Sequence, residues 1–581
     1  MKSRAYSPLS LTLLGVILLT VLWTVYWFGF QSSLTLLRGA PRGEPAAALF
    51  LPKDPPLVMS LFTNPQKLQD LRQLRTPLRQ RGQAKAEFKR LKASLLADTN
   101  LDYGRDIEPW LGDEITLAVT TADLDRNPAN GTQPGYLLAL EVRDGERSRE
   151  FLDLFWQNKA VSGRELQFEE YKGVKLIYSR KTLPPTGDGL QLKDFNPFAK
   201  KSAGEWSSAL VGDRFVLFAN APEVLRKAIN DAQVEDLNLQ HSPTYQKAIA
   251  RLDDQRIGVI LADVPQLSGW LGGDSVTPDS QLPDTLAIGL GLSRQGLLAD
   301  TVWASSNDES TVSPELDHPV AALNYVPEES ALVLAGTDLA SRWRRVSQAV
   351  SGGDLLSRLL TQPLGELESR WGISLQEDIF DWVTGDYALA LLPNVDDDAL
   401  DWIFVAEDPP ENHPQSDAAI GRLDEAAAAN GYSVGPFTLK DQHRILAWTR
   451  LMTKEGKTTE GNLRLRLEAD VLGVRGQLND YRLLASSIEA IDWAYTSPRR
   501  NSLLANGQFR KELPLLPEDN DGYLYLNWQE SQGALRQQLP FLRVLELTGN
   551  PLVDHLRSLL LSTEGSRNGV HRAQVLIKLI P

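Results

Sequence analysis

The chain has 581 residues, a length that favours about two to four domains of ~150 residues each. Hydrophobic residues make up 42% and charged residues 23%, which is ordinary globular usage and excludes a collagen-like or wholly disordered chain. The net charge of −15 argues against a nucleic-acid partner, because phosphate-driven binding needs a basic face. The absence of cysteine excludes disulfides, thiolate metal sites and cysteine nucleophiles.

The first element along the chain is an apolar segment, residues 9–30. It has no charged residue and is long enough to cross a ~30 Å hydrocarbon core as a helix. A cleaved signal peptide is the alternative, but its apolar region would span only about 7–15 residues. Trp23 and Trp27 at the far end favour the membrane–water interface. We therefore expect an uncleaved single-pass anchor between a short tail, residues 1–8, and a linker, residues 31–45.

Positive charges on the two sides of this segment give a slight orientation signal. Lys2 and Arg4 precede the segment, whereas Arg38 and Arg42 follow it. With the amino terminus, Lys2 and Arg4 give the preceding side slightly more positive charge than the following side. The positive-inside rule therefore favours a cytoplasmic tail. The sequence therefore predicts a membrane protein whose bulk is extracytoplasmic, in a periplasm or an equivalent lumen.

The rest of the chain contains an internal duplication. LPKDPPLVMSLFTNPQKL, from Leu51, lines up with VPEESALVLAGTDLASRW, from Val326. Further on, LDYGRDIEPWLGDEITLAV, from Leu101, matches ISLQEDIFDWVTGDYALAL, from Ile373. Both of these later segments carry Asp-Ile, then Trp, then Gly with an acidic residue, and further matches follow in the same order. The repeated positions are Asp106, Trp110, Gly112, Asp378, Trp382 and Gly385.

These matches divide the chain into two copies, residues 46–307 and 320–581, joined by an acidic linker, residues 308–319. Strand patterns in each copy alternate polar and apolar residues, which is typical of antiparallel sheets with one solvated face. Helical patterns fall between groups of strands rather than after every strand. We therefore expect an α+β fold: two tandem copies of a mainly antiparallel sheet with helices, preceded by one N-terminal transmembrane helix.

Three motifs suggest a family. They are D-I-x-x-W-x-G-[DE] at 106–113 and, more loosely, 378–386; Y-x-G at 171–173; and G-D-x-F-V-L-F-A-N-x-P-E-x-L at 212–225. They resemble a bacterial, largely cyanobacterial group known as domain of unknown function 3352. The second copy departs from the pattern, with Asn479-Asp480-Tyr481 where the first has Gly-Asp-Arg. The resemblance implies a membrane-anchored extracytoplasmic protein, adds the thylakoid lumen as a location, and brings no catalytic residues.

Patterns that would indicate catalysis or a metal are incomplete. No G-x-S-x-G elbow and no H-E-x-x-H spacing occurs, and the segment Leu451 to Thr459 lacks the first glycine of a phosphate-binding loop. Acidic loops at 123–131, 396–398 and 519–522 could be calcium loops, but solvated turns explain them better. We predict no catalytic residue, no metal and no cofactor.

A helical stretch at 66–97 is strongly basic, with a net charge of 9 − 2 = +7 on an otherwise acidic chain. Leucines at helical spacing would face the core, so the charges would form either a solvated face or a contact surface for anionic lipid or an acidic partner. The candidate contact residues are Arg72, Arg75, Arg79, Arg81, Lys85, Lys89, Arg90 and Lys92.

The sequence thus favours a non-enzymatic protein that acts through protein contacts, as an assembly, scaffold or envelope or thylakoid maintenance factor. We expect the membrane and an unidentified protein as partners, and no nucleic acid. Two alternatives stay open: a module that binds a lipid or apolar ligand between the two sheets, and a hydrolase with an unrecognised carboxylate or metal site.

Overall fold

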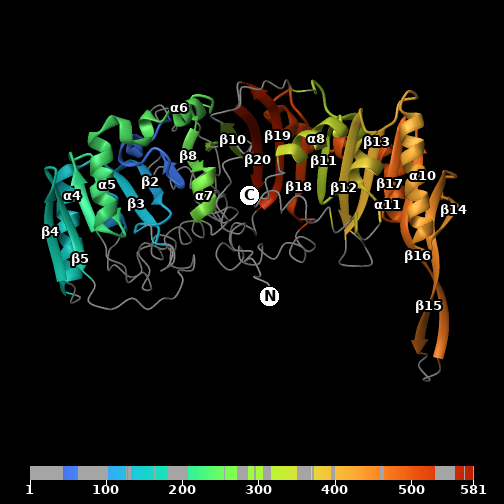
Figure 1. Cartoon of the computed structure of the whole chain (residues 1–581), viewed down its shortest axis with the longest axis horizontal. Coiled ribbons are helices and arrows are strands. Elements are labelled where there is room, and N and C mark those ends of the chain that lie inside the picture. The colour runs from blue at the N-terminus through green and yellow to red at the C-terminus, as the bar shows by residue number, and fades with distance from the viewer. Residues whose placement is uncertain are drawn as a thin grey trace, which may run out of the picture.

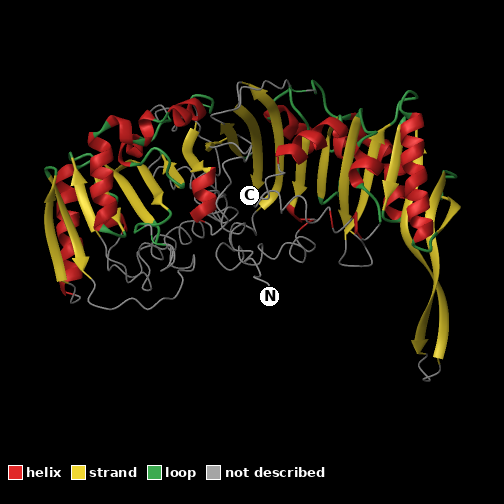
Figure 2. Cartoon of the chain, in the orientation of Figure 1, coloured by secondary structure: helices red, strands yellow, loops and turns green. Residues whose placement is uncertain are grey.

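The fold is given by a computed structural model, shown in Figure 1 and coloured by secondary structure in Figure 2. The residues that it describes are 43–62, 103–125, 127, 133–161, 165–180, 207–253, 256–270, 285–292, 296–304, 314, 316–349, 365, 368–369, 372–393, 400–457, 463–529, 531, 556–567 and 570–579.

Strands dominate this part of the chain and form a 20-stranded sheet. Every pairing in it is antiparallel. The strands are β1 (Leu57–Leu61), β2 (Leu111–Thr121), β3 (Gly135–Val142), β4 (Glu165–Tyr171), β5 (Val174–Arg180), β6 (Ser207–Val211), β7 (Phe215–Ala219), β8 (Arg256–Asp263), β9 (Thr285–Leu292), β10 (Leu297–Ala304), β11 (Leu332–Thr337), β12 (Asp386–Pro393), β13 (Leu400–Glu407), β14 (Ser433–Thr438), β15 (Arg444–Lys457), β16 (Leu463–Leu478), β17 (Tyr481–Ala485), β18 (Tyr523–Asn527), β19 (Leu556–Arg567) and β20 (Val570–Leu579).

The strands follow one order in each half of the sheet. In the first half the order is β4-β5-β6-β7-β3-β2-β1-β8-β9-β10. In the second half it is β14-β15-β16-β17-β13-β12-β11-β18-β19-β20, so each strand of the first half has a counterpart ten numbers later. The described parts of the two halves therefore share a topology.

The two halves join edge to edge through β10 and β20, which pair along eight positions from Leu297–Ile577 to Ala304–Val570. Figure 1 shows the two strands side by side near the middle of the long axis. The expectation of two tandem sheets is therefore wrong, because the described strands form one continuous sheet. Joining the last strand of each half removes two open edges, which would otherwise expose unpaired backbone groups.

Helices cover both faces of the sheet. The α-helices in the described ranges are α4 (Gly145–Val161), α5 (Pro222–Gln233), α6 (Pro243–Ile249), α7 (Val264–Trp270), α8 (Leu339–Ala349), α10 (His413–Ala429), α11 (Ile488–Arg500) and α12 (Phe509–Glu512). The shorter helical turns are η1 (Ala46–Phe50), η2 (Tyr103–Ile107), η5 (Glu235–Leu237), η6 (Leu239–His241), η7 (Ala321–Tyr325), η8 (Gln376–Phe380), η9 (Leu503–Ala505) and η10 (Leu513–Leu515).

Successive strand residues point to opposite faces of the sheet, and apolar residues on each face form a hydrophobic core there. In β7, Leu217 packs with α5, α6 and η1, whereas its neighbour Phe218 packs with α4 and η2 on the other face. In β13, Val405 packs with α11, α12 and η7, whereas Phe404 packs with α10 and η8. Because successive strand residues point to opposite faces, both faces need apolar residues, and strands such as FVLFA in β7 are apolar throughout.

The predicted membrane anchor, residues 9–30, lies outside the described residues, as does the tail before it. Of the helices that the structure describes, none is long and apolar enough to cross a membrane. The anchor and the domain boundaries proposed from the sequence stay predictions.

Candidate functional site

The repeated sequence motif lies at the start of β2 in the first half and of β12 in the second. Trp110 and Trp382 are both buried, and each indole N–H donates to a backbone carbonyl four residues earlier. The N–O distances are 2.8 Å to Asp106 O and 3.3 Å to Asp378 O. Each tryptophan thereby holds a π-helical turn, η2 or η8, against the sheet.

The two motif aspartates have different partners. Asp378 accepts from Arg422 Nε of α10 at 2.6 Å and from the backbone N–H of Ser374 at 2.9 Å. Asp106 instead accepts from the guanidinium of its exposed neighbour Arg105. The motif aspartate therefore joins η8 to α10 in the second half, whereas in the first half Asp106 pairs with the adjacent residue Arg105.

The motif glycines make room for a glutamate at the end of the adjacent strand. A Cβ on Gly112 would lie 2.8 Å from Glu141 Cγ, and a Cβ on Gly385 would lie 2.5 Å from Glu407 Oε2. Glu141 Oε2 accepts from the backbone N–H of Glu114 at 3.0 Å, and Glu407 Oε2 accepts from that of Asp386 at 3.0 Å. A side chain at either position would displace the glutamate, because the glutamate occupies the space where a Cβ would lie.

A second carboxylate in each half caps a helical turn. Glu114 accepts from the backbone N–H groups of Ala46 (2.8 Å) and Ala47 (2.9 Å), the first residues of η1. Asp386 accepts from the N–H of Ala321, the first residue of η7, at 2.7 Å. Helix N-termini leave such donors without intrahelical partners, so these carboxylates satisfy them.

Burial raises the pKa of Glu114 and of Asp386 above their ordinary values, and backbone N–H donors act in the opposite direction. The glutamates Glu141 and Glu407 raise these values further through like-charge repulsion. Raised carboxyl pKa values are typical of catalytic acids. Here both groups are occupied by backbone donors, which is the arrangement of a structural cap.

Two aromatic pairs beside these carboxylates distinguish the halves. Phe50 and Phe215 form an edge contact with centroids 5.3 Å apart, and Tyr325 and Tyr481 lie 4.7 Å apart at the corresponding places. Burial raises the pKa of Tyr481, and Glu407 and Asp386 add to the effect. Its hydroxyl therefore stays protonated at neutral pH, where it can serve as a hydrogen-bond donor.

A serine, a histidine and an aspartate meet at the start of α10, a cluster that the sequence analysis missed. Ser416 Oγ donates to Asp408 Oδ2 at 2.9 Å, and His413 Nε2 lies 3.7 Å from the same oxygen. In a hydrolytic triad the histidine stands between serine and carboxylate. Here the buried Ser416 hydroxyl bonds the carboxylate directly, and Arg482 also pairs with it. The cluster therefore fits a structural role at the helix start.

The described residues of two acidic loops contain turns closed by side-chain acceptors. Asp125 Oδ1 accepts from the backbone N–H of Asn127 at 3.0 Å, and Asp123 Oδ1 accepts from that of Gln133 at 3.0 Å. The fully buried Asn520 accepts from the N–H of Gly522 at 2.9 Å. Across the ranges that the structure covers, no three His, Asp or Glu residues form a group that could hold a metal ion. The loop 396–398 lies outside those ranges.

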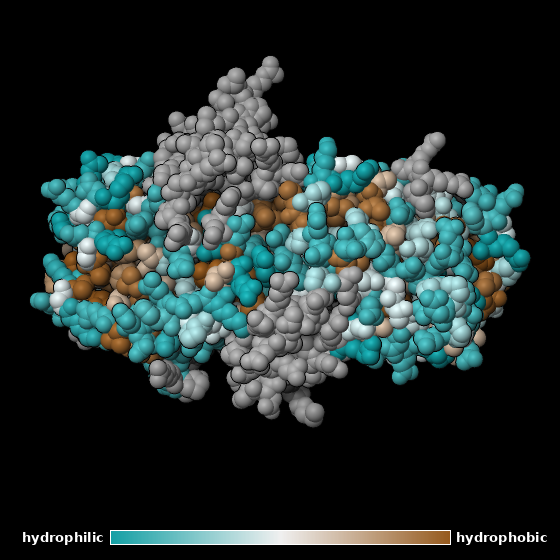
Figure 3. Space-filling model, turned by 90° about the horizontal axis from the view of Figure 1, so that it is seen from above, coloured by the Kyte–Doolittle hydropathy of each residue, from teal (hydrophilic) through white to brown (hydrophobic). Residues whose placement is uncertain are grey.

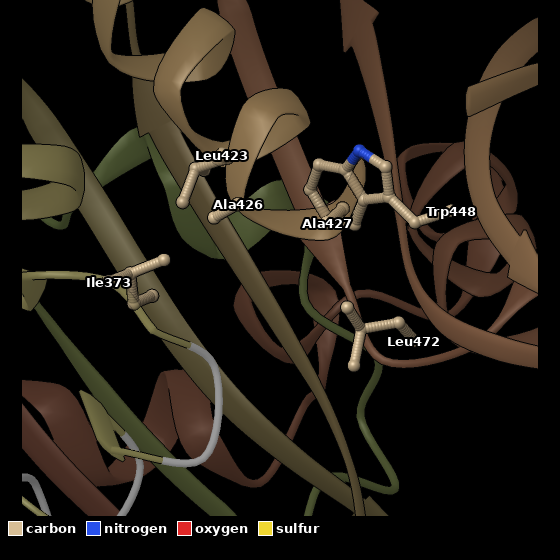
Figure 4. Close-up of a pocket in the computed structure, with 6 residues that line it drawn as sticks. All are labelled: Ile373, Leu423, Ala426, Ala427, Trp448 and Leu472. Atoms are coloured by element: carbon tan, nitrogen blue, oxygen red, sulfur yellow. The ribbon is translucent and has the colours of Figure 1, made fainter. Parts of the chain in front are cut away.

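A small apolar hollow lies between α10 and the strands β15 and β16 (Figure 4). It has about 210 Å³ of empty space, open solvent included, and its lining residues are Ile373, Leu423, Ala426, Ala427, Trp448 and Leu472. Because that volume counts open solvent, the enclosed space is much smaller still. The hollow is therefore too small for a lipid chain. The lipid-binding alternative also required a space between two sheets, whereas the described strands form a single sheet.

The basic segment 66–97 also lies outside the described residues, so its predicted contact surface stays untested. Surface residues at both ends of the sheet are better defined. Phe168 of β4 is 62% exposed at one end, and Phe437 of β14 and Leu451 of β15 are 45% and 74% exposed at the other. Figure 3 shows hydrophobic residues at the surface toward both ends of the long axis. Strand alternation could have indicated these residues, but their position at the ends depends on the pairing order.

Comparison with known proteins gives one match. The family described as "Protein of unknown function (DUF3352)" matches residues 11–579. Neither the comparison with curated proteins nor that with solved structures found a match. Since the matched range covers both halves of the sheet, the chain belongs to the DUF3352 family.

Proposed function

We propose that this chain is a non-enzymatic, single-pass membrane protein with its sheet outside the cytoplasm, and that it works through protein contacts in assembly or envelope maintenance. The anchor and its orientation rest on residues 9–30 and the flanking charges. The structural roles of the carboxylates and of the serine cluster support a protein without a catalytic centre. Strand β4, which lies at one end of the described sheet, carries the proposal.

Strand β4 pairs with β5 along seven positions, from Glu165–Arg180 to Tyr171–Val174, and no other described strand pairs with it. An open edge offers a row of backbone donors and acceptors to an extended segment of another chain. The strand has no proline, whereas β14, the strand at the opposite end, contains Pro436. Proline removes a backbone donor, so β4 is the better edge for adding a strand.

Side chains on β4 indicate what such a segment would contain. Phe168 is largely exposed, and Lys175 Nζ lies 5.3 Å from the centre of its ring. Glu165 and Glu170 are exposed, whereas Glu169 is held by Arg226 at 2.9 Å. An extended segment with an apolar residue opposite Phe168 and basic residues beside it would complement this edge.

The test is affinity isolation of the full chain from gently solubilised membranes, comparing wild type with Phe168→Asp. We expect a specific partner to co-purify with the wild type and to be lost from Phe168→Asp, because the charge removes the apolar contact. Phe437→Asp, at the opposite end strand, is the matched control and should keep the partner. Identical recovery from all three proteins would overturn the proposal. Protease added from each side of the membrane tests the orientation separately.

A further inference from the structure

Strand β4 presents backbone groups on the side that faces away from β5, at one end of the long axis in Figure 1. The turn between the two strands has φ values of 49° and 79° at residues 172 and 173, as a two-residue type I′ turn requires. The pair that closes such a turn, here Tyr171–Val174, is hydrogen-bonded, and such pairs alternate with non-hydrogen-bonded ones. The outward N–H and C=O groups are therefore those of Leu166, Phe168 and Glu170.

The sequence of β4 is suited to pair with a second copy of itself. Two identical antiparallel strands place one residue opposite itself, and centring the pair on Phe168, the middle of β4, pairs the whole strand. Each glutamate then lies opposite a leucine, a glutamine or a tyrosine. A pair centred on Gln167 would oppose Glu165 and Glu169, and one centred on Glu169 would oppose two copies of that residue. Because like charges directly opposite destabilise a strand pair, the Phe168 register is favoured.

Helix α4 adds apolar side chains beside this edge. Trp156 Nε1 donates to Ser208 Oγ of β6 at 2.8 Å, so that flank of the helix faces the inner strands. Leu154 is two residues away, about 200° around the helix, and therefore lies on the flank toward β4. Val161, one heptad further along, lies on the same flank. Leu154 is 50% exposed and Val161 89%, so this flank is apolar surface in contact with solvent.

Phe168 belongs to the same surface. Its partner on β5, Ile177, packs in the core beneath α4, and partners across an antiparallel pair share a face of the sheet. Lys175 Nζ lies 5.3 Å from the centre of the Phe168 ring and brings positive charge to a strand with three glutamates. A second copy therefore supplies an aromatic residue opposite Phe168 and a cation beside it.

We propose that β4 pairs antiparallel with β4 of a second copy of this chain, so that one sheet runs through a symmetric dimer. This proposal rests on the proposed function, in which the β4 edge binds a partner, and it names that partner. The halves of the chain already join in this way, since the equivalent strands β10 and β20 pair antiparallel, edge to edge. In the dimer, Leu154 and Val161 of both copies lie on one face, beside the two Phe168 rings.

The mass of the purified full chain in detergent tests the dimer. Sedimentation equilibrium at a density that matches the detergent should give twice the mass of one chain for the wild type. Phe168→Asp should raise the dissociation constant about tenfold or more, because it opposes two like charges at the centre of the strand pair. Phe437→Asp, the same change on the opposite end strand β14, is the matched control and should leave the dimer intact. Unchanged far-UV circular dichroism shows that each variant is folded.

A charge pair tests whether residue 168 faces itself. Phe168→Asp and Phe168→Lys should each be monomeric alone, whereas chains with different tags that carry one change each should form mixed dimers, because opposite charges then meet. A wild-type dimer that Phe168→Asp leaves intact, or the absence of mixed dimers, would overturn the proposal. A monomeric wild type would overturn it too. If the affinity isolation still finds a different protein that Phe168→Asp loses, the proposed function stands without the dimer.

Discussion

Asp300 of β10 and Arg572 of β20 form an ion pair across the seam between the two halves, with Arg572 Nη2 3.1 Å from Asp300 Oδ2. Asp300 is almost fully buried, and its Oδ2 also accepts from the backbone N–H of Asp253 at 2.8 Å. The pair joins residues 272 positions apart in the chain. The two halves are therefore joined by eight paired residue positions of β10 and β20 and by this ion pair.

Removing one partner of this pair should destabilise the protein. We expect Arg572→Met to cost about 1–3 kcal/mol, because a buried carboxylate loses a charged hydrogen-bond partner. The double variant Asp300→Asn, Arg572→Met should recover part of that loss, since the charge left without its partner is removed too. Urea unfolding of the full chain in detergent measures the free energy of unfolding of the wild type and of both variants. A single variant as stable as wild type would show that the pair contributes nothing.

The seam also predicts that the halves associate when they are separate chains. Co-expressed fragments 1–307 and 320–581 should co-purify, because β10 and β20 would restore the same antiparallel pairing. Val302→Pro, in the middle of β10, should abolish this association, since proline removes a ladder donor from a central strand. Proline in place of Gln246, which is exposed on α6 and belongs to no strand, controls for loss of local structure. Association of the Val302→Pro fragment at wild-type strength would contradict the prediction.

Much of each half could be predicted from the sequence, because the relevant signals are local. Matching segments placed Trp110 and Trp382 at equivalent positions, and strand alternation indicated antiparallel pairing. The seam could not be predicted in this way. Alternation in LLADTVWA is equally compatible with an edge strand and with a central one, and the partner of β10 lies more than 260 residues away.

The candidate sites show the same limit. Gly112 and Gly385 recur visibly in the sequence, but their cause, a glutamate from the neighbouring strand, appears only once β2–β3 and β12–β13 are paired. Asp113 and Glu114 are neighbours in β2, and because strand neighbours point to opposite faces, their spacing indicates no carboxylate pair. The structure pairs Glu114 instead with Glu141, whose side chain accepts from the backbone of Glu114. Sequence spacing cannot reveal a pair that depends on register.

These glycines give a sharp test of packing. Gly385→Ala would place a methyl group 2.5 Å from Glu407 Oε2, so we expect a loss of about 1–3 kcal/mol from overpacking. Gly421→Ala is the control, because nothing lies within 4 Å of its added Cβ. Gly421 is inside α10, where alanine should stabilise the helix by about 0.5–1 kcal/mol. The two variants should shift the urea midpoint in opposite directions, and equal shifts would contradict the proposed contact.

Finally, the two capping carboxylates predict a pH dependence of stability. Their pKa values are raised in the folded protein above the ordinary 4.5 for Glu114 and 3.8 for Asp386. A folded state that binds protons more tightly than the unfolded state is stabilised fully below the ordinary values, and this stabilisation is lost as pH rises through the folded values. The variant Glu114→Gln, Asp386→Asn should therefore show a weaker fall in unfolding free energy between about pH 4 and neutrality. Glu169→Gln is the control of opposite sign, because Arg226 lowers the pKa of Glu169 and its stabilisation is lost as pH falls. Urea unfolding at a series of pH values gives both slopes, and a slope unchanged in the double variant would show that these caps do not titrate in this range.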